Sequence, residues 1–84
     1  MAKIIMGIQL EQRQETAQAV QELLTKFGCY IKTRIGVHDA SEDKCSSNGL
    51  IILEFIGNAD KEAHDLETQL LGIQNVIVKK MELN

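Results

Sequence analysis

The chain has 84 residues, 44% of them hydrophobic, with no Trp and a formal net charge of −3. This length predicts a single domain over residues 1–84, and its core has to be built from aliphatic side chains because the sequence holds only two Phe and one Tyr. Nine basic against twelve acidic residues, without a basic cluster, exclude the electrostatic footprint of a protein that binds nucleic acid by itself.

The cysteines and the apolar segments indicate the compartment. Cys29 and Cys45 are the two cysteines, and no segment is apolar over a length that could cross a membrane or serve as a signal peptide. We therefore expect a cytoplasmic protein with free thiols and without a membrane partner.

The first third of the chain predicts a strand followed by a helix. Apolar residues occupy every second position of residues 4–10, a period of two that is typical of a strand. In residues 13–27 the apolar side chains recur at helical spacing, at Ala17, Val20, Leu23, Leu24 and Phe27. Gly28 follows, and a glycine after the last helical residue can adopt the left-handed conformation that ends a helix.

The middle of the chain predicts a hairpin. A strand is expected from Cys29 or Tyr30 to His38, and we expect its β-branched face to lie against the helices: Ile31, Thr33, Ile35 and Val37. The opposite face would then carry Tyr30, Lys32, Arg34, Gly36 and His38. Residues 39–48 are polar and rich in turn formers, which predicts a long loop before an apolar strand at residues 50–56 that is covered on both faces.

The last third predicts a second helix and a fourth strand. Asn58 or Asp60 is a candidate N-cap, and the apolar stripe of the helix comprises Ala63, Leu66, Leu70 and Leu71. Gly72 ends this helix, and residues 75–83 form the final strand. The order βαββαβ predicts an α+β ferredoxin-like sandwich, in which two helices cover one face of a four-stranded antiparallel sheet.

The other face of this sheet has no covering element in the expected fold. Ile5 and one side of the strand at residues 50–56 would leave an apolar patch on the order of several hundred Å² there, which is large for a monomer. We therefore expect a homodimer or a tetramer that forms through sheet faces. Gly7 and Gly36 interrupt strands, and they mark either bulges or close backbone approach at a subunit contact.

The second strand also carries a family resemblance. The segment Arg34-Ile35-Gly36-Val37, the helix-ending Gly28, the apolar opening strand and the closing GIQNVIVKK at residues 72–80 resemble the iron-only hydrogenase system regulator family over nearly the whole chain. The resemblance implies an ACT-like fold, related to the regulatory domain of the nickel-responsive repressor. It also implies oligomerisation and a role as a transcriptional regulator of hydrogenase or related metabolism, without a DNA-binding domain of its own.

One departure limits what the resemblance implies. Amino-acid-binding ACT domains carry an Asp-x-x-Gly turn after the first strand, whereas residues 10–15 read LEQRQE, with no glycine. Amino-acid binding is therefore not part of the expectation.

A small anion is the ligand that the polar residues favour. Arg13 and Arg34 are the candidate anion contacts, Gly36 would allow close backbone approach and His38 lies beside them, which predicts an effector site at a subunit boundary. Arg34 has an alternative role, an ion pair with Glu54 across the sheet, because buried charges have partners.

Catalysis and cofactors find no support in the sequence. The glycine spacing fits no phosphate-binding loop, and no Ser or His has a carboxylate in a triad pattern, so we expect neither an enzyme nor a cofactor. His38 and Cys45 flank the loop and are candidate ligands for a soft metal ion if a second subunit completes the site. The leading hypothesis is a ligand-sensing regulatory module. The alternatives are a structural assembly subunit without a ligand and a metal sensor.

Overall fold

The computed structural model describes the backbone of residues 3–11, 14–40 and 45–83, and the side chains of these ranges except at positions 11, 14, 37–40 and 45–48. Within these ranges the chain forms β1 (Lys3–Glu11), α1 (Gln14–Lys26), a 3-10 turn (Gly28–Tyr30), β2 (Ile31–Ala40), β3 (Cys45–Phe55), α2 (Asp60–Leu71) and β4 (Val76–Leu83). The expected α+β, ACT-like βαββαβ order is therefore confirmed.

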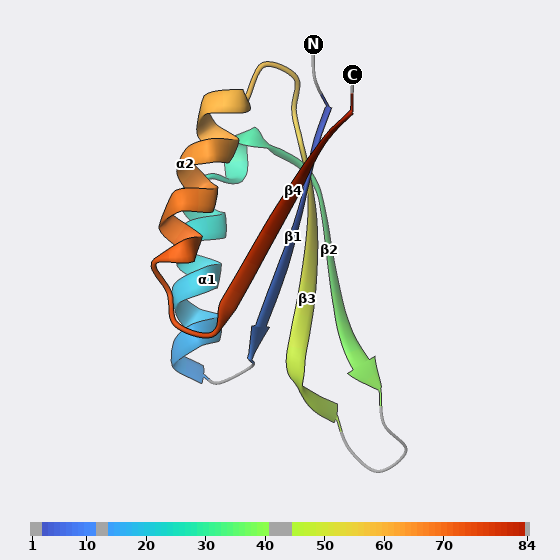
Figure 1. Ribbon diagram of the computed structural model, residues 1–84, viewed down its shortest axis with the longest axis vertical. Coiled ribbons are helices and arrows are strands. Elements are labelled where there is room, and N and C mark those ends of the chain that lie inside the picture. Colours follow the sequence, from blue (N-terminus) through green and yellow to red (C-terminus); the bar gives the residue numbers. More distant parts are fainter. Residues whose placement is uncertain (1–2, 12–13, 41–44, 84) are drawn as a thin grey trace.

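The four strands form one antiparallel sheet in the order β2-β3-β1-β4. Both helices lie on one side of this sheet, and the two chain ends lie at the same end of the molecule (Figure 1). The strands β2 and β3 extend past the helices at the opposite end (Figure 1). β3 occupies an interior position, as its apolar sequence predicted.

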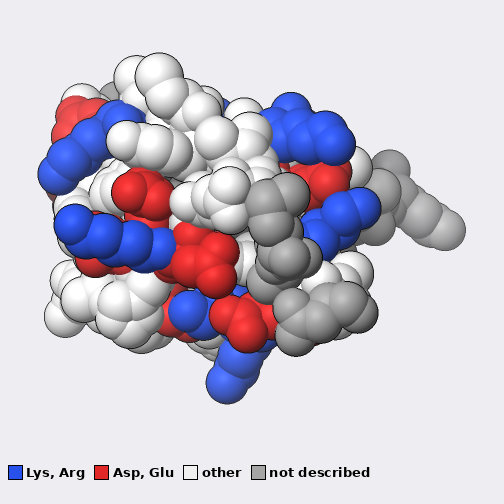
Figure 2. Space-filling view, turned by 90° about the horizontal axis from the view of Figure 1, so that it is seen from above, with Lys and Arg blue, Asp and Glu red and all other residues white. Residues whose placement is uncertain are grey.

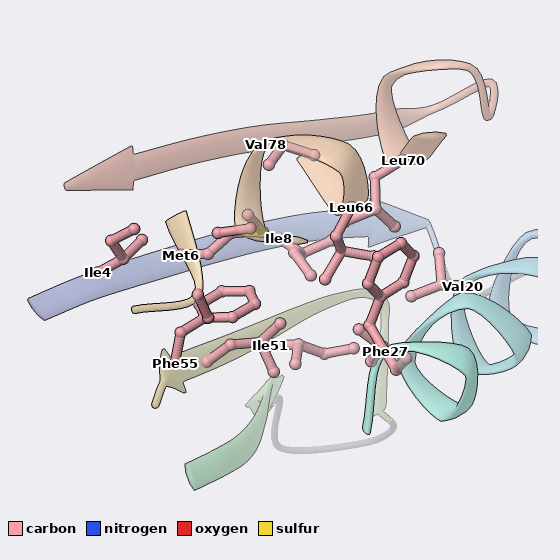
Figure 3. Packing of buried hydrophobic residues seen from close by; sticks show 14 of the residues in the cluster. Ile4, Met6, Ile8, Val20, Phe27, Ile51, Phe55, Leu66, Leu70 and Val78 are labelled. Carbon is pink, nitrogen blue, oxygen red and sulfur yellow. The ribbon is translucent and has the colours of Figure 1, made fainter. Parts of the chain in front are cut away.

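The core lies between the sheet and the helices. Burial alternates strictly along β1: Ile4, Met6, Ile8 and Leu10 are buried, and the residues between them are not. Side chains of β1 and β3 meet Phe27 and Leu66 from the helical side of the molecule in one continuous cluster (Figure 3). This cluster confirms the period-two prediction for residues 4–10.

The two helices bury the stripes that the sequence predicted, with one exception. Val20 and Leu24 of α1 are buried, and Leu66 and Leu70 of α2 are fully buried. Leu71, in contrast, is 58% exposed. A helix turns about 100° per residue, so Leu71 points away from the sheet that Leu70 contacts. The expectation that Leu71 belongs to the buried stripe is wrong.

The helix ends differ from the expected caps. No glycine in the described ranges has a positive φ; Asn58 and Asn75 take this conformation instead. Gly28 begins the 3-10 turn, in which the Tyr30 N–H donates to the Phe27 carbonyl at 3.0 Å, so the left-handed cap expected at Gly28 is wrong. Ala59 is the N-cap of α2 and provides no side-chain hydrogen bond, so the expected cap by Asn58 or Asp60 is also wrong.

A β-bulge near the start of β2 reverses the faces expected for this strand. Ile31 pairs with Phe55, but the next regular pair is Thr33 with Glu54, so Lys32 is an extra residue in the ladder. A shift of one residue exchanges the two faces of a strand. From Thr33 onward the alternation is therefore opposite to the expected one.

The register shows the consequence for the next two residues. Arg34 pairs with Leu53, a fully buried core residue, so Arg34 lies on the helix side of the sheet. Ile35 pairs with Ile52 and lies on the open side. The expectation that Thr33 and Ile35 face the helices while Arg34 and Gly36 occupy the open face is wrong.

The hairpin loop is shorter than expected. Strand pairing continues as far as Ala40 with Cys45, with a second irregularity between His38 and Ala40. The long loop predicted for residues 39–48 is therefore wrong. Backbone hydrogen bonds sustain a hairpin that extends past the helices, so its polar sequence is no obstacle to strand formation.

Candidate functional site: the open sheet face and Arg34

The sheet face opposite the helices, called the open face below, is largely apolar. All four strands contribute to it, and its apolar members are Ile5, Ile35, Leu50, Ile52, Ile77, Met81 and Leu83. Five of these side chains are between 38% exposed, at Leu50, and 56% exposed, at Ile77. The apolar open face that the sequence predicted is present, although the bulge changes which residues of β2 belong to it.

The free energy available from covering this face can be estimated. Complete burial of an aliphatic side chain contributes about 1.5–3 kcal/mol, so covering the exposed halves of five such side chains would contribute roughly 4–7 kcal/mol per copy of the chain. Association itself costs on the order of 4–15 kcal/mol. Two such faces packed together would therefore offset a cost of this size.

Gly7 lies near the centre of the open face. It pairs with Ile52 on one side and with Lys79 on the other, in an uninterrupted register, so it is not a bulge. A Cβ atom built at Gly7 would have no heavy atom within 4 Å, and Gly7 has no positive φ. The described part of the chain therefore gives no steric or conformational reason for a glycine here.

A polar group, called the Glu54 cluster below, lies at one end of the open face. The Glu54 carboxylate accepts a hydrogen bond from the Thr33 hydroxyl at 3.2 Å and lies 3.7 Å from the Lys3 ammonium and 3.8 Å from the Lys32 ammonium. These contacts join β1, β2 and β3 at the end of the sheet that carries the chain termini. Seen from this end, acidic and basic side chains alternate over the surface without forming a patch of one sign (Figure 2).

Arg34 does not form the ion pair with Glu54 that was one of its expected roles. Its guanidinium lies on the helix side of β2 and donates a hydrogen bond to the Gln21 side-chain oxygen of α1. In the part of the chain that the structure describes, the partner of Arg34 is thus a neutral amide. Arg34 is exposed, and among the described side chains no carboxylate forms an ion pair with it.

Gly36 follows Arg34 on the same side of β2. It pairs with Ile51 in regular register and is exposed, and a Cβ atom there would also have no heavy atom within 4 Å. Arg34 and Gly36 together form an open edge of the molecule beside α1. The structure therefore brings these two predicted site residues together, on the helix side and not on the open face.

The other predicted site residues are only partly placed. Arg13 lies outside the described residues, as do the side chains of His38 and Cys45. The backbone of His38 pairs with Gly49, which pairs with Leu10 of β1, so the ends of β1 and β2 lie two strand spacings apart, roughly 10 Å. The predicted Arg13–Arg34 pair and the predicted metal ligands stay predictions.

Within the described ranges no three His, Cys, Asp or Glu side chains are grouped so that they could hold a metal ion. None of the helices in those ranges is long and apolar enough to cross a membrane. Cys29 is a free, exposed thiol.

Sequence reasoning missed Gln21 and Lys3. Gln21 lies four residues after Ala17 and three before Leu24, which both pack in the core, and this helical spacing was the available signal that it lies beside the buried stripe. Lys3 could have been placed beside Glu54 from the antiparallel pairing of the first and third strands in the expected fold.

Solved structures with this arrangement are similar to the chain, and two of them cover it nearly completely. The uncharacterized protein TM1266 from Thermotoga maritima is 25% identical, with a TM-score of 0.79 and full coverage of both chains. The ACT domain from the GTP pyrophosphokinase of Chlorobium tepidum is 22% identical over 94% of this chain and 96% of that domain, with a TM-score of 0.66. No family model and no curated protein sequence matches the chain.

A third structure extends the comparison to another group of proteins. CPII from Thiomonas intermedia K12, a nitrogen regulatory PII-like protein whose structure holds ADP, AMP and bicarbonate, has a TM-score of 0.56 at 13% identity. The match covers 100% of this chain and 94% of the CPII chain. These similarities agree with the strand order and helix placement described above, and the chain has an ACT-like, ferredoxin-like fold.

Proposed function

We propose that this protein is a small regulatory module that binds an anionic effector and works as a homo-oligomer. The observation that carries the proposal is the environment of Arg34. Among the described residues the guanidinium is held by the neutral Gln21 amide and by no carboxylate, and it lies beside a glycine that leaves its backbone accessible. Planar guanidinium groups of this kind are well suited to carboxylates and phosphates.

The similar folds support this proposal without identifying the effector. CPII is a regulatory protein described with ADP, AMP and bicarbonate, all of which are anions. The Chlorobium tepidum structure is the ACT domain from a GTP pyrophosphokinase. We therefore choose ADP, AMP, bicarbonate and inorganic phosphate as the first probes.

Thermal unfolding of the wild type with each probe tests the proposal. A probe at ten times its dissociation constant stabilises the folded form by about 1.4 kcal/mol, which corresponds to roughly 6–11 °C in a domain of this size. We expect at least one probe to raise Tm and Arg34→Ala to lose the increase. Lys61→Ala is the matched control, since it removes one positive charge from an exposed position on α2.

The two variants separate a site from a general charge effect. Equal losses in Arg34→Ala and Lys61→Ala would contradict a site at Arg34, as would a full Tm increase in Arg34→Ala. If none of the four anions changes Tm while the protein self-associates, the structural assembly subunit becomes the better description.

The regulatory role carries two further proposals. The resemblance around Arg34-Ile35-Gly36-Val37 supports a cytoplasmic, non-catalytic transcriptional regulator of hydrogenase or related metabolism in the iron-only hydrogenase system regulator family. Because the chain has a net charge of −3, we propose that a partner protein makes the DNA contacts. Co-purification from the native cell should recover a DNA-binding protein, and recovery of the chain alone would contradict this role.

The metal sensor is the remaining alternative. His38 and Cys45 lie in paired strands of one hairpin, near its end, and a second subunit could complete a coordination sphere. Titration with Ni²⁺ or Zn²⁺ followed by equilibrium dialysis tests this alternative. Stoichiometric binding that His38→Ala abolishes would favour it over the anion-sensing module.

A further inference from the structure

The open face and Gly7 together carry an inference about how two copies of the chain meet. Gly7 lies in the central strand β1 between Met6 and Ile8, both fully buried on the helix side, so the vacant Cβ position of Gly7 points to the open face. Glycine weakens the interior of a strand because it gains no side-chain contacts and loses more backbone freedom on folding. Close approach of an atom from outside the chain would account for a glycine that the described residues do not require.

The surroundings of Gly7 define what can approach. Ile52 and Lys79 flank it across the neighbouring strands, and Ile5 and Gln9 precede and follow it on the same face of β1. Ile35 continues the same row beyond Ile52. The space above Gly7 is thus bordered by isoleucines toward β3 and β2 and by Lys79 of the edge strand β4, whose aliphatic stem can line an apolar contact while its ammonium reaches solvent.

We infer that the open face is covered by a second copy of the chain, and that the space above Gly7 receives an apolar side chain of that copy. This inference rests on the self-association in the proposed function and specifies its surface. Each copy carries Gly7 as well as the exposed Ile35, Ile77 and Met81 on one face. In a symmetric pair, each copy therefore offers the free space above its Gly7 and also the aliphatic side chains that can fill this space in its partner.

The dimensions and the polar groups of the face agree with such a pair. Four strands of about eight residues present a face on the order of 500 Å² in projection, comparable with one side of a standard protein interface. The Glu54 cluster lies at one end of the face, where it would form part of a polar rim around the apolar centre. In this cluster the carboxylate is already paired, so it does not have to be buried as an isolated charge.

The sharpest test replaces Gly7 in the full chain and measures self-association by sedimentation velocity over the micromolar range. Gly7→Val adds a β-branched side chain at an exposed-face strand position where the Cβ atom has no heavy atom of its own chain within 4 Å, so we expect the fold to be kept. In the pair, the same side chain occupies the position of the partner atom. We expect a dissociation constant at least about tenfold higher than that of the wild type, and an intermediate value for Gly7→Ala.

Gly28→Val is the matched control. It makes the same change at another glycine whose Cβ position has no heavy atom within 4 Å and whose φ is not positive, but in the 3-10 turn that follows α1. We expect it to associate as the wild type does. Ile77→Glu places a charge at a position that is 56% exposed in the single chain, so it should fold normally and dissociate the pair.

The outcomes separate this inference from the proposed function. A monomeric wild type overturns both the self-association and the inference. A wild-type oligomer whose dissociation constant is unchanged by Gly7→Ala and Gly7→Val overturns the role of Gly7 and leaves the anion-sensing proposal intact. Dissociation by Gly28→Val as strong as by Gly7→Val overturns the assignment of the interface to the open face.

Discussion

Two adjacent leucines at the end of α2 provide a direct test of the packing. Leu70 is fully buried against the core, whereas Leu71 is 58% exposed, although both belong to the apolar stripe expected from the sequence. Leu70→Ala and Leu71→Ala remove the same atoms from neighbouring positions of one helix. Any difference between the two variants therefore reports the environment of each side chain and not the chemistry of the change.

The structure sets the size of the expected difference. Replacing a fully buried leucine by alanine costs about 2–5 kcal/mol, because apolar contacts are lost and a cavity remains. At Leu71, less than half of the side chain is covered, so the loss should stay below about 1 kcal/mol, and the higher helix propensity of alanine offsets part of it. For a domain with a total stability near 4–13 kcal/mol, roughly 0.05–0.15 kcal/mol per residue, only Leu70→Ala removes a large fraction.

Urea denaturation followed by far-UV circular dichroism measures both free energies of unfolding. Each variant should be compared with the wild type at two protein concentrations, because self-association makes the apparent stability depend on concentration. Leu71→Ala should also leave the oligomeric state unchanged, since Leu71 lies on the helical side of the molecule. Equal losses at the two positions, or dissociation by Leu71→Ala, would refute the assignment of the buried and open surfaces.

Two further predictions concern charges. Glu67→Gln should lower the free energy of unfolding by less than about 1 kcal/mol, because the Glu67 carboxylate lies 3.3 Å from the Lys80 ammonium and 3.8 Å from the His64 imidazole in a partly exposed group. The loss should decrease with salt, which denaturation at low and high salt measures. A loss that is independent of salt would contradict the electrostatic origin. The isolated protein should not bind random duplex DNA at low salt, because its net charge is −3; micromolar affinity that falls with rising salt would show this prediction to be wrong.

The sequence alone determined the element order and most of the core. Alternation at Ile4, Met6, Ile8 and Leu10 reflects a strand with one buried face, and the stripes of the two helices follow from helical spacing. These patterns are local: each depends on the period of side-chain directions within one element. They were sufficient to predict the ferredoxin-like fold and the existence of an uncovered apolar face.

Only the tertiary structure decided the faces of β2 and the surroundings of Arg34. A single extra residue, Lys32, exchanges the two faces of the strand, and its polar side chain carries no signal that it is the extra one. The partner of Arg34 depends on how α1 packs on the sheet, which brings Gln21 to it across 13 positions of the chain. Arg34 and Gly36 were predicted as site residues, but their place on the helix side could not be.

The open face shows why the pattern of apolar residues is not sufficient. Ile35 was predicted to face the helices because it is apolar, and it lies on the other side of the sheet. Burial of an apolar side chain is favourable whatever surface covers it, so its chemistry does not distinguish a helix of the same chain from the surface of another chain. The packing of all four strands and both helices decides which apolar residues of this chain are left for a partner.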